Sequence, residues 1–149
     1  MQNILNTNLY LGSKNDYYSI KDKSDWVFVH CCHSFYQTLE NQEVKVIILD
    51  KRLYIDWVDL PDISSFEISD FAQAMNFLDK YIKTNKILVH CDWGQSRSAT
   101  LVMVYLAKRL ELIPNTFIEA LEKFVKVYPD YQLPSGISKF VKINWKDIK

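Results

Sequence analysis

The chain alternates between short runs of β-branched and aromatic residues and longer stretches in which apolar residues recur with the period of a helix. The run VKVIILD at 44–50 is rich in β-branched residues, as a buried strand would be. The stretch at 68–84 instead has apolar residues with helical spacing, namely Phe71, Met75, Leu78 and Ile82. Strands separated by helices predict an α/β fold, with a central, mostly parallel sheet of four to five strands flanked by helices.

The other predicted elements follow the same alternation. The predicted strands are NLYL at 8–11, WVFVHC at 26–31, VKVIILD at 44–50, LYIDWV at 53–58 and KILVH at 86–90. The predicted helices are 68–84, 98–112, 116–128 and a last one after Gly136. Pro114 ends the second helix, and Thr116 with Glu119 forms a capping box for the third. The apolar run LVMVYLA at 101–107 predicts that the second helix is buried.

Composition predicts one soluble domain over residues 1–149, because 48% of residues are hydrophobic and 24% charged. The 18 basic and 18 acidic residues balance to a net charge of zero, which argues against nucleic acid and against a polybasic membrane anchor. The stretch MQNILNTNLYLGSKND lacks the pattern of a secretory leader, and no apolar run approaches the length of a membrane span. Three cysteines form no disulfide framework, so we expect a reducing, cytoplasmic location.

The stretches VHCDWGQSRS and VHCC begin alike, but the residues that follow them differ. Cys91 is followed by Gly94 and Arg97, whereas neither a glycine nor an arginine follows Cys31 at these distances. The first stretch is typical of a strand, a tight loop and a helix, whose free N–H groups favour an anion. Gly94 permits the sharp turn, and Arg97 can hold two phosphoryl oxygens. Since such surroundings favour a thiolate, the pattern predicts a nucleophile suited to attack on phosphorus.

The segment HCDWGQSRS resembles the His-Cys-x5-Arg-Ser loop of the cysteine-dependent tyrosine phosphatases. The resemblance extends along the chain in the order of the dual-specificity phosphatases. It includes NILNTNLYLGS near the start, SRSATLVMVYLA after the loop, and FIEALEKFVKVYPDYQLPSG beyond it. The low-molecular-weight tyrosine phosphatases fit badly, because their loop follows the first strand. The resemblance implies a phosphatase-like α/β fold and a dual-specificity catalytic domain over residues 1–149.

The resemblance also implies roles for individual residues. Cys91 is the nucleophile, Arg97 holds the phosphoryl group, and the hydroxyl of Ser98 stabilises the departing thiolate. Ser98 could equally cap the following helix. His90 is expected to orient the loop through hydrogen bonds. The predicted phosphate-binding residues are Cys91, Asp92, Trp93, Gly94, Gln95, Ser96 and Arg97, with Asp92 and Trp93 on the rim.

A general acid is needed because an alkoxide or phenoxide leaves poorly without a proton. The family places an aspartate on a loop about thirty residues before the cysteine, where this chain has Asp59 and Asp62. We favour Asp59, which follows the predicted strand at 53–58 on the same edge as Cys91 and begins an Asp-Leu-Pro segment. Asp62 stays an alternative, whereas Asp56 is expected to lie inside the strand.

The remaining cysteines and histidines are expected to be structural. Cys31 and Cys32 align with a strand of the family and are predicted core residues, and a redox role for either is left open. The three histidines, His30, His33 and His90, lack metal-ligand spacing, so neither a metal site nor any other cofactor is expected.

The function predicted from these residues is metal-independent hydrolysis of phosphotyrosine, phosphoserine and phosphothreonine on proteins, through a phosphocysteine intermediate. One alternative is a phosphatase for phosphoinositides or RNA 5′-phosphates, which the acidic Asp92 and the absence of lysine in the loop disfavour. Another is a phosphopeptide-binding module, which typically loses the cysteine or the arginine that this chain keeps. The expected partner is a phosphorylated protein, and a monomer is the default.

Overall fold

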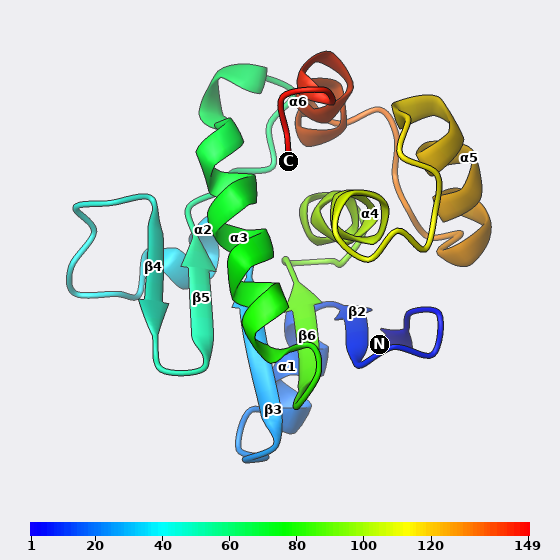
Figure 1. The fold of residues 1–149 in the computed structure, drawn as a ribbon. Helices are drawn as coiled ribbons and strands as arrows, with labels where there is room; N and C mark the ends of the chain where they lie inside the picture. Colours follow the sequence, from blue (N-terminus) through cyan, green and yellow to red (C-terminus); the bar gives the residue numbers. More distant parts are fainter.

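The computed structural model describes residues 1–149, whose sheet has six strands in the order β1-β2-β6-β3-β5-β4 (Figure 1). The four central strands are parallel: β2 (Leu9–Gly12), β6 (Lys86–His90), β3 (Trp26–His30) and β5 (Arg52–Ile55). The two outer strands are antiparallel to their neighbours: β1 (Gln2–Asn3) and β4 (Val46–Leu49). The predicted α/β class is therefore confirmed, with antiparallel edges that make the sheet mixed.

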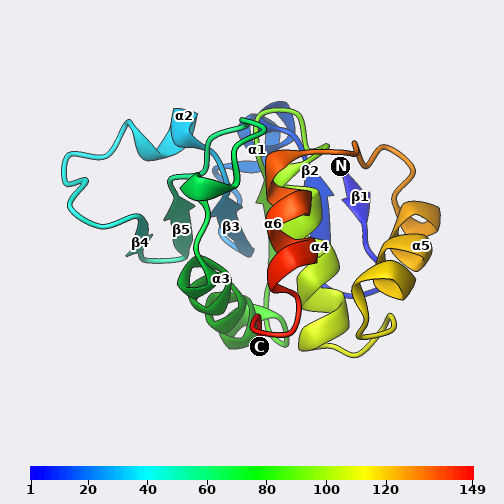
Figure 2. The same cartoon turned by 90° about the horizontal axis from the view of Figure 1, so that it is seen from above.

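Helices cover both faces of the sheet, as the view from above shows (Figure 2). One face carries α3 (Ile68–Tyr81), α4 (Arg97–Lys108), α5 (Phe117–Val127) and α6 (Gly136–Asn144). The other face carries α1 (Lys14–Ile20) and α2 (His33–Tyr36). A short 3-10 helix, η1 (Ile63–Ser65), precedes α3. The sequence pattern did not predict α1 and α2, because helices of seven and four residues are too short to display a period.

The strand predicted at 44–50 is present as β4, but the prediction that it is buried is wrong. β4 lies at the sheet edge, where Ile48 and Leu49 are 54% and 51% exposed. The β-branched content of a segment reports how well it fits a pleated sheet and not whether a second strand will cover it. The predicted strand at 53–58 also ends early, at Ile55. There the N–H of Trp57 donates a hydrogen bond to the carbonyl of Ile55, in a turn, and not to a neighbouring strand.

The predicted burial of 101–107 is confirmed. α4 is buried from Arg97 to Ala107, because it lies on the sheet and contacts α5 and α6 on its other sides. An all-round apolar sequence is what a helix enclosed in this way requires. No helix combines the length and the apolar character that crossing a membrane would need.

Candidate active site

Cys91 follows the last residue of β6, at the carboxyl edge of the parallel strands where α/β folds bind ligands. β6 has a hydrogen-bonded neighbour on both sides, because β2 and β3 pair with it up to His90. The N–H of Cys31, just beyond β3, donates to the carbonyl of His90 at 2.8 Å. Cys91 is only 2% exposed, so the sheet fixes the thiol at the base of the loop that follows.

The loop between Cys91 and α4 turns at Gly94, whose φ of 75° lies in the left-handed region. A Cβ at this position would lie 2.4 Å from the carbonyl oxygen of Gly12, so a larger residue could not pack here. Two carbonyl groups of the loop accept hydrogen bonds from residues outside it. The hydroxyl of Tyr128 donates to the carbonyl of Gly94 at 2.8 Å, and the N–H of Gln132 donates to the carbonyl of Gln95 at 2.7 Å.

The backbone N–H groups of residues 92–97 have no hydrogen-bond acceptor within the protein. Six consecutive free donors follow Cys91 and end at the first residue of α4, where the helix dipole adds positive potential. Free amides in a tight loop at a helix start form an anion-binding nest. The loop is therefore built to bind an anion next to the thiol.

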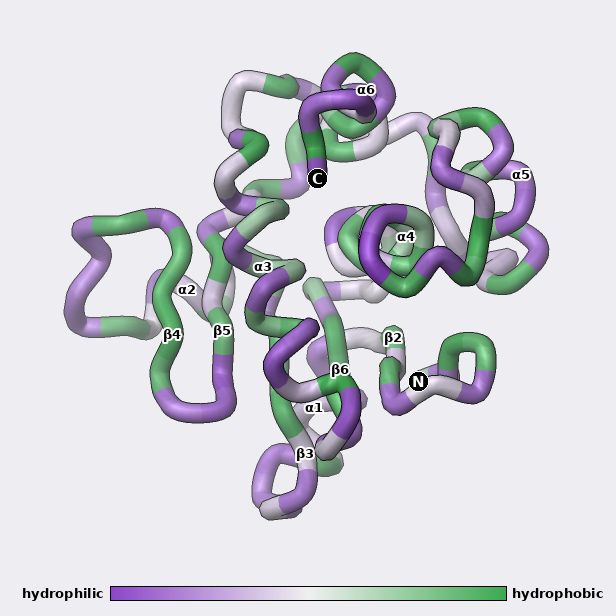
Figure 3. Tube along the Cα trace, in the orientation of Figure 1, coloured by the Kyte–Doolittle hydropathy of each residue, from purple (hydrophilic) through white to green (hydrophobic).

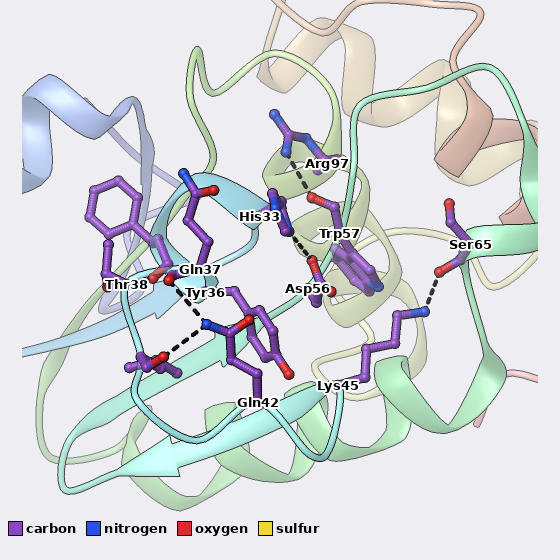
Figure 4. Close-up of polar contacts among 12 residues, drawn as sticks. His33, Tyr36, Gln37, Thr38, Gln42, Lys45, Asp56, Trp57, Ser65 and Arg97 are labelled. Carbon is purple, nitrogen blue, oxygen red and sulfur yellow. Dashed lines mark hydrogen bonds and ion pairs between the residues drawn. The ribbon is translucent and has the colours of Figure 1, made fainter.

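Arg97 is 3% exposed, and two of its guanidinium nitrogens are held in place. Its Nη1 donates to the carbonyl of Trp57 at 2.9 Å (Figure 4), and its Nη2 donates to Oδ2 of Asp92 at 3.0 Å. Its Nε has no partner. Burial by itself lowers the pKa of Arg97, but Cys91 and the carboxylates of Asp92 and Asp59 raise it above its ordinary value.

Asp92 is in turn held by Ser34, whose hydroxyl donates to Oδ1 at 2.7 Å. Burial opposes ionisation of Asp92, but the hydrogen bonds from Ser34 and Arg97 lower its pKa below the usual range. The hydroxyl of Ser98 lies 3.2 Å from Sγ of Cys91. The alternative that Ser98 caps α4 is wrong, because the helix starts at Arg97 and its N-cap position is Ser96.

The two candidate acids lie in different settings. Asp59 lines a recess of about 210 Å³ together with Ser96 of the loop, Gln132 and Gly136. Its segment approaches α6 closely, because a Cβ on Gly136 would lie 2.0 Å from the carbonyl oxygen of Leu60.

Asp62 instead caps η1, accepting from the N–H of Ser64 at 2.9 Å and from its hydroxyl at 2.7 Å. These hydrogen bonds lower the pKa of Asp62. Asp56 lies just beyond β5, and its carboxylate pairs with Nδ1 of His33 at 2.6 Å (Figure 4). Of the three carboxylates, Asp59 is the one that lines the recess beside the loop.

The family profile described as the dual specificity phosphatase catalytic domain matches residues 9–128. The chain belongs to the dual specificity phosphatase family. It is 36% identical over 93 residues to the Arabidopsis thaliana dual specificity protein phosphatase PHS1, covering 56% of this chain and 10% of that protein. It is 28% identical over 123 residues to a probable dual specificity protein phosphatase of Dictyostelium discoideum, covering 77% of this chain and 53% of that protein. The chain therefore spans between about a tenth and about half of these relatives.

Solved structures share the fold of this phosphatase domain. The crystal structure of DUSP15 has a TM-score of 0.66 at 22% identity, covering 97% of this chain and 86% of that one. The structure of PTPMT1 in complex with PI(5)P has a TM-score of 0.60 at 20% identity, covering 93% and 88%.

A buried histidine pair, His30 and His90, lies beside the start of the loop of residues 92–96. Nδ1 of His30 and Nε2 of His90 are 2.5 Å apart, and Nδ1 of His90 lies 3.1 Å from the carbonyl oxygen of Cys91. Burial lowers the pKa of His90 to about 4, and burial together with the neighbouring His90 lowers that of His30 to about 2. With both rings neutral, His30 donates to His90 and His90 donates to the loop carbonyl. The expected hydrogen bonding of His90 to the loop is present, but sequence reasoning missed its partner.

The other residues of the two stretches divide between core and rim. Cys31 and Cys32 are buried, as predicted for core residues. Burial raises the pKa of the Cys31 thiol well above its ordinary value and that of Cys32 to about 11. Trp93 is 68% exposed on the rim of the loop of residues 92–96, with Nζ of Lys14 5.5 Å from its ring centroid.

Sequence reasoning also missed residues that hold the loop from a distance, namely Ser34, Trp57, Tyr128 and Gln132. Only their positions in the fold connect them to the site, so no local motif could have identified them.

Proposed function

We propose that residues 1–149 form one catalytic domain that hydrolyses phosphate monoesters on proteins through a phosphocysteine intermediate. The observation that carries the proposal is the run of six unsatisfied N–H groups at residues 92–97 beside the thiol of Cys91. This nest, together with the unpaired Nε of Arg97, supplies donors that would bind the three oxygens of a phosphoryl group.

In the first step, the thiolate of Cys91 attacks phosphorus, so that a P–S bond forms while the bond to the leaving oxygen breaks. The amides and Arg97 balance the charge on the phosphoryl oxygens in the transition state. Asp59 donates a proton to the leaving oxygen, which departs as a neutral alcohol or phenol. Its position in the recess beside the loop supports this role over Asp62, whose carboxylate caps η1.

In the second step, water attacks the phosphocysteine and Asp59 accepts its proton, so that inorganic phosphate forms and the thiolate of Cys91 leaves. The hydroxyl of Ser98, 3.2 Å from Sγ, can donate a hydrogen bond to the departing thiolate. Stabilising the leaving sulfur lowers the barrier of this step, in which the P–S bond breaks.

Asp92 is proposed as a positioning residue for Arg97. Held by Ser34, it fixes Nη2 while the carbonyl of Trp57 fixes Nη1. These two contacts leave Nε unpaired, and an arginine held in one orientation loses little freedom when it binds phosphate.

The proposed substrates are phosphotyrosine, phosphoserine and phosphothreonine side chains. The loop contains a carboxylate, Asp92, and no lysine, so Arg97 is the only basic side chain that the loop itself offers to a substrate with more than one phosphate. The second candidate, a phosphoinositide phosphatase, has one point in its favour: PTPMT1, which shares the fold, was solved with PI(5)P.

The experiment is a turnover and burst assay on p-nitrophenyl phosphate, followed by a panel of phosphopeptides, phosphatidylinositol phosphates and RNA with a 5′-phosphate. We expect multiple turnovers and highest kcat/KM on the phosphopeptides. Higher kcat/KM on the lipids or RNA would contradict the protein substrate class. Phosphopeptide binding without turnover would instead assign a binding module.

A reducing, cytoplasmic environment is proposed because all three cysteines are free thiols, and the proposed chemistry needs Cys91 reduced. The proposed oligomeric state is a monomer, which sedimentation velocity would test.

A further inference from the structure

One groove of the molecule lies away from the loop of residues 92–96. It has a volume of about 640 Å³ and runs between the loop of residues 38–44 and the edge strand β4. None of its lining residues belongs to the catalytic loop or to the recess at Asp59. Its size is that of a ligand pocket, and six of its ten lining residues are hydrophobic.

One wall of the groove is a strand edge with free backbone groups. The N–H of Asp56 donates to the carbonyl of Lys45, which makes these two residues a hydrogen-bonded pair of the antiparallel ladder. Because such pairs alternate, Ile47 faces β5, whereas the N–H and C=O groups of Val46 and Ile48 point to the open side. This side has no neighbouring strand, since β4 is the last in the sheet.

Apart from the shortness of β4, which has four residues, the edge lacks the features that usually protect an open strand. Val44 and Ile48 are 61% and 54% exposed, and the hydrophobic stretch of β4 is visible at the outer edge of the molecule (Figure 3). Lys45 could guard the edge, but its Nζ turns inward to Oδ2 of Asp70 at 2.8 Å and to the carbonyl of Ser65 (Figure 4). Proteins typically cover or charge such edges, so an apolar, open one indicates a partner.

The opposite wall is preformed by its own hydrogen bonds (Figure 4). Nε2 of Gln42 donates to the carbonyls of Gln37 and Leu39 at 3.0 and 2.8 Å. The hydroxyl of Tyr36 donates to the carbonyl of Val44 at 2.5 Å. These hydrogen bonds order the loop, so a ligand would not have to order it on binding.

The charged residues that line the groove are Glu40 and Glu43, both exposed, and no basic residue lines it. A second copy of the chain, paired edge to edge, would bring four of these carboxylates together, and like charges disfavour that contact. A basic partner would instead be attracted.

We propose that this groove binds an extended segment of a partner protein, which adds to β4 as a strand. The segment has apolar side chains at alternate positions and basic side chains near Glu40 and Glu43. Its backbone completes the hydrogen bonds of Val46 and Ile48, as in other cases of strand addition. The site needs no catalytic residue and stands apart from the proposed phosphatase reaction.

The probe is the acetylated and amidated peptide Arg-Val-Lys-Val-Arg-Val-Lys, titrated into the ¹⁵N-labelled full chain. We expect saturable shifts centred on the amides of Val46 and Ile48. Two control peptides carry either N-methyl groups on the pairing amides or glutamate in place of each basic residue, and both should bind at least tenfold more weakly.

The matched variants are Ile48→Lys and the double variant Glu40→Gln with Glu43→Gln. Each should weaken binding of the probe by about tenfold, which corresponds to about 1.4 kcal/mol. Turnover of p-nitrophenyl phosphate should stay within twofold of the parent chain, which also shows that each variant folds. Should Ile48→Lys fail to fold, the double variant carries the test, since both its side chains are exposed.

The proposal is overturned if the peptide causes no saturable shift, or if the N-methylated or the acidic control binds equally well. It is also overturned if sedimentation equilibrium shows a dimer that Ile48→Lys dissociates, because the occupant would then be a second copy.

Discussion

The ends of β3 and β6 are two versions of the same structure side by side. The strands are parallel neighbours paired from Trp26 with Lys86 to His30 with His90, and each continues into a buried cysteine. After Cys91 come a loop with free amides and the twelve-residue helix α4. After Cys31 comes α2, which has four residues and therefore little dipole.

The difference lies in what surrounds each thiol. Burial, together with the neighbouring Cys91 and Cys32, raises the pKa of Cys31 well above the ordinary value, although Arg97 opposes this. Cys91 has Ser98 at 3.2 Å and the guanidinium of Arg97 nearby. A strand that ends in His-Cys is thus not sufficient to form an anion-binding nest beside the thiol; the loop and the helix that follow Cys91 provide it.

The largest effect is expected from exchanging the two cysteines for serine in turn. Cys91→Ser should lower kcat by roughly 10⁴-fold or more, because the nucleophile is lost, while vanadate still binds to the loop amides and Arg97. Cys31→Ser should keep kcat within a few-fold. Steady-state kinetics and vanadate titration of both variants measure this. Comparable loss of kcat in a folded Cys31→Ser chain would contradict the proposal that Cys91, and not Cys31, is the nucleophile.

The next effect concerns Asp59, the proposed general acid for the site at the end of β6. Asp59→Asn should lower kcat on a phosphotyrosine peptide by roughly 10²–10⁴-fold, and much less on an aryl phosphate whose leaving group is already a stable anion. It should also remove the alkaline limb of the pH–rate profile. Asp62→Asn is the matched control and should change little. If Asp62→Asn removes the limb and Asp59→Asn keeps it, the assignment is reversed.

The histidine pair that links the two strand ends should make stability depend on pH. His90, with its pKa lowered to about 4, stays neutral in the folded chain, whereas the unfolded chain binds a proton below about pH 6.5. Stability is therefore fully present above pH 6.5 and falls on acidification, by about 3 kcal/mol for His90 by pH 4.

Urea unfolding measured from pH 6 to pH 5 gives the number of protons bound on unfolding. His30→Phe should lower that number by about one, because one titrating ring is gone. An unchanged number would mean that His30 is protonated in the folded chain.

A smaller effect is expected on the stability of the non-catalytic strand end. Cys31→Ser and Cys32→Ser should each lower the free energy of unfolding by about 1–3 kcal/mol, because a hydroxyl replaces a thiol in a buried site. Chemical denaturation measures this. No loss of stability in either variant would show that the β3 end tolerates a polar group and is not part of the core.

The smallest effect should come from chelation. No group of three or more His, Cys, Asp or Glu side chains is arranged to hold a metal ion, and this includes the histidines and cysteines at the ends of β3 and β6. Turnover of p-nitrophenyl phosphate should be unchanged in excess EDTA. Loss of turnover in EDTA, restored by a divalent ion, would contradict the thiolate mechanism.

The sequence predicted the parts of the site that are contiguous, from Cys91 to Ser98, because a strand, a glycine turn and a helix start are local events. For the general acid, the sequence favoured Asp59 and left Asp62 as an alternative. Two contacts give Asp59 and Asp62 different surroundings: Leu60 packs closely against Gly136, and Asp62 caps η1. Both are contacts formed after the chain has folded.

By itself, therefore, the sequence determined the α/β class, the buried α4 and the composition of the loop. Tertiary structure alone decided that β3 lies beside β6, so that His30 meets His90 and Ser34 reaches Asp92. It also decided that β4 is an open edge. The physical reason is that periodicity and turn chemistry act over a few residues, whereas strand order depends on which distant apolar surfaces bury one another.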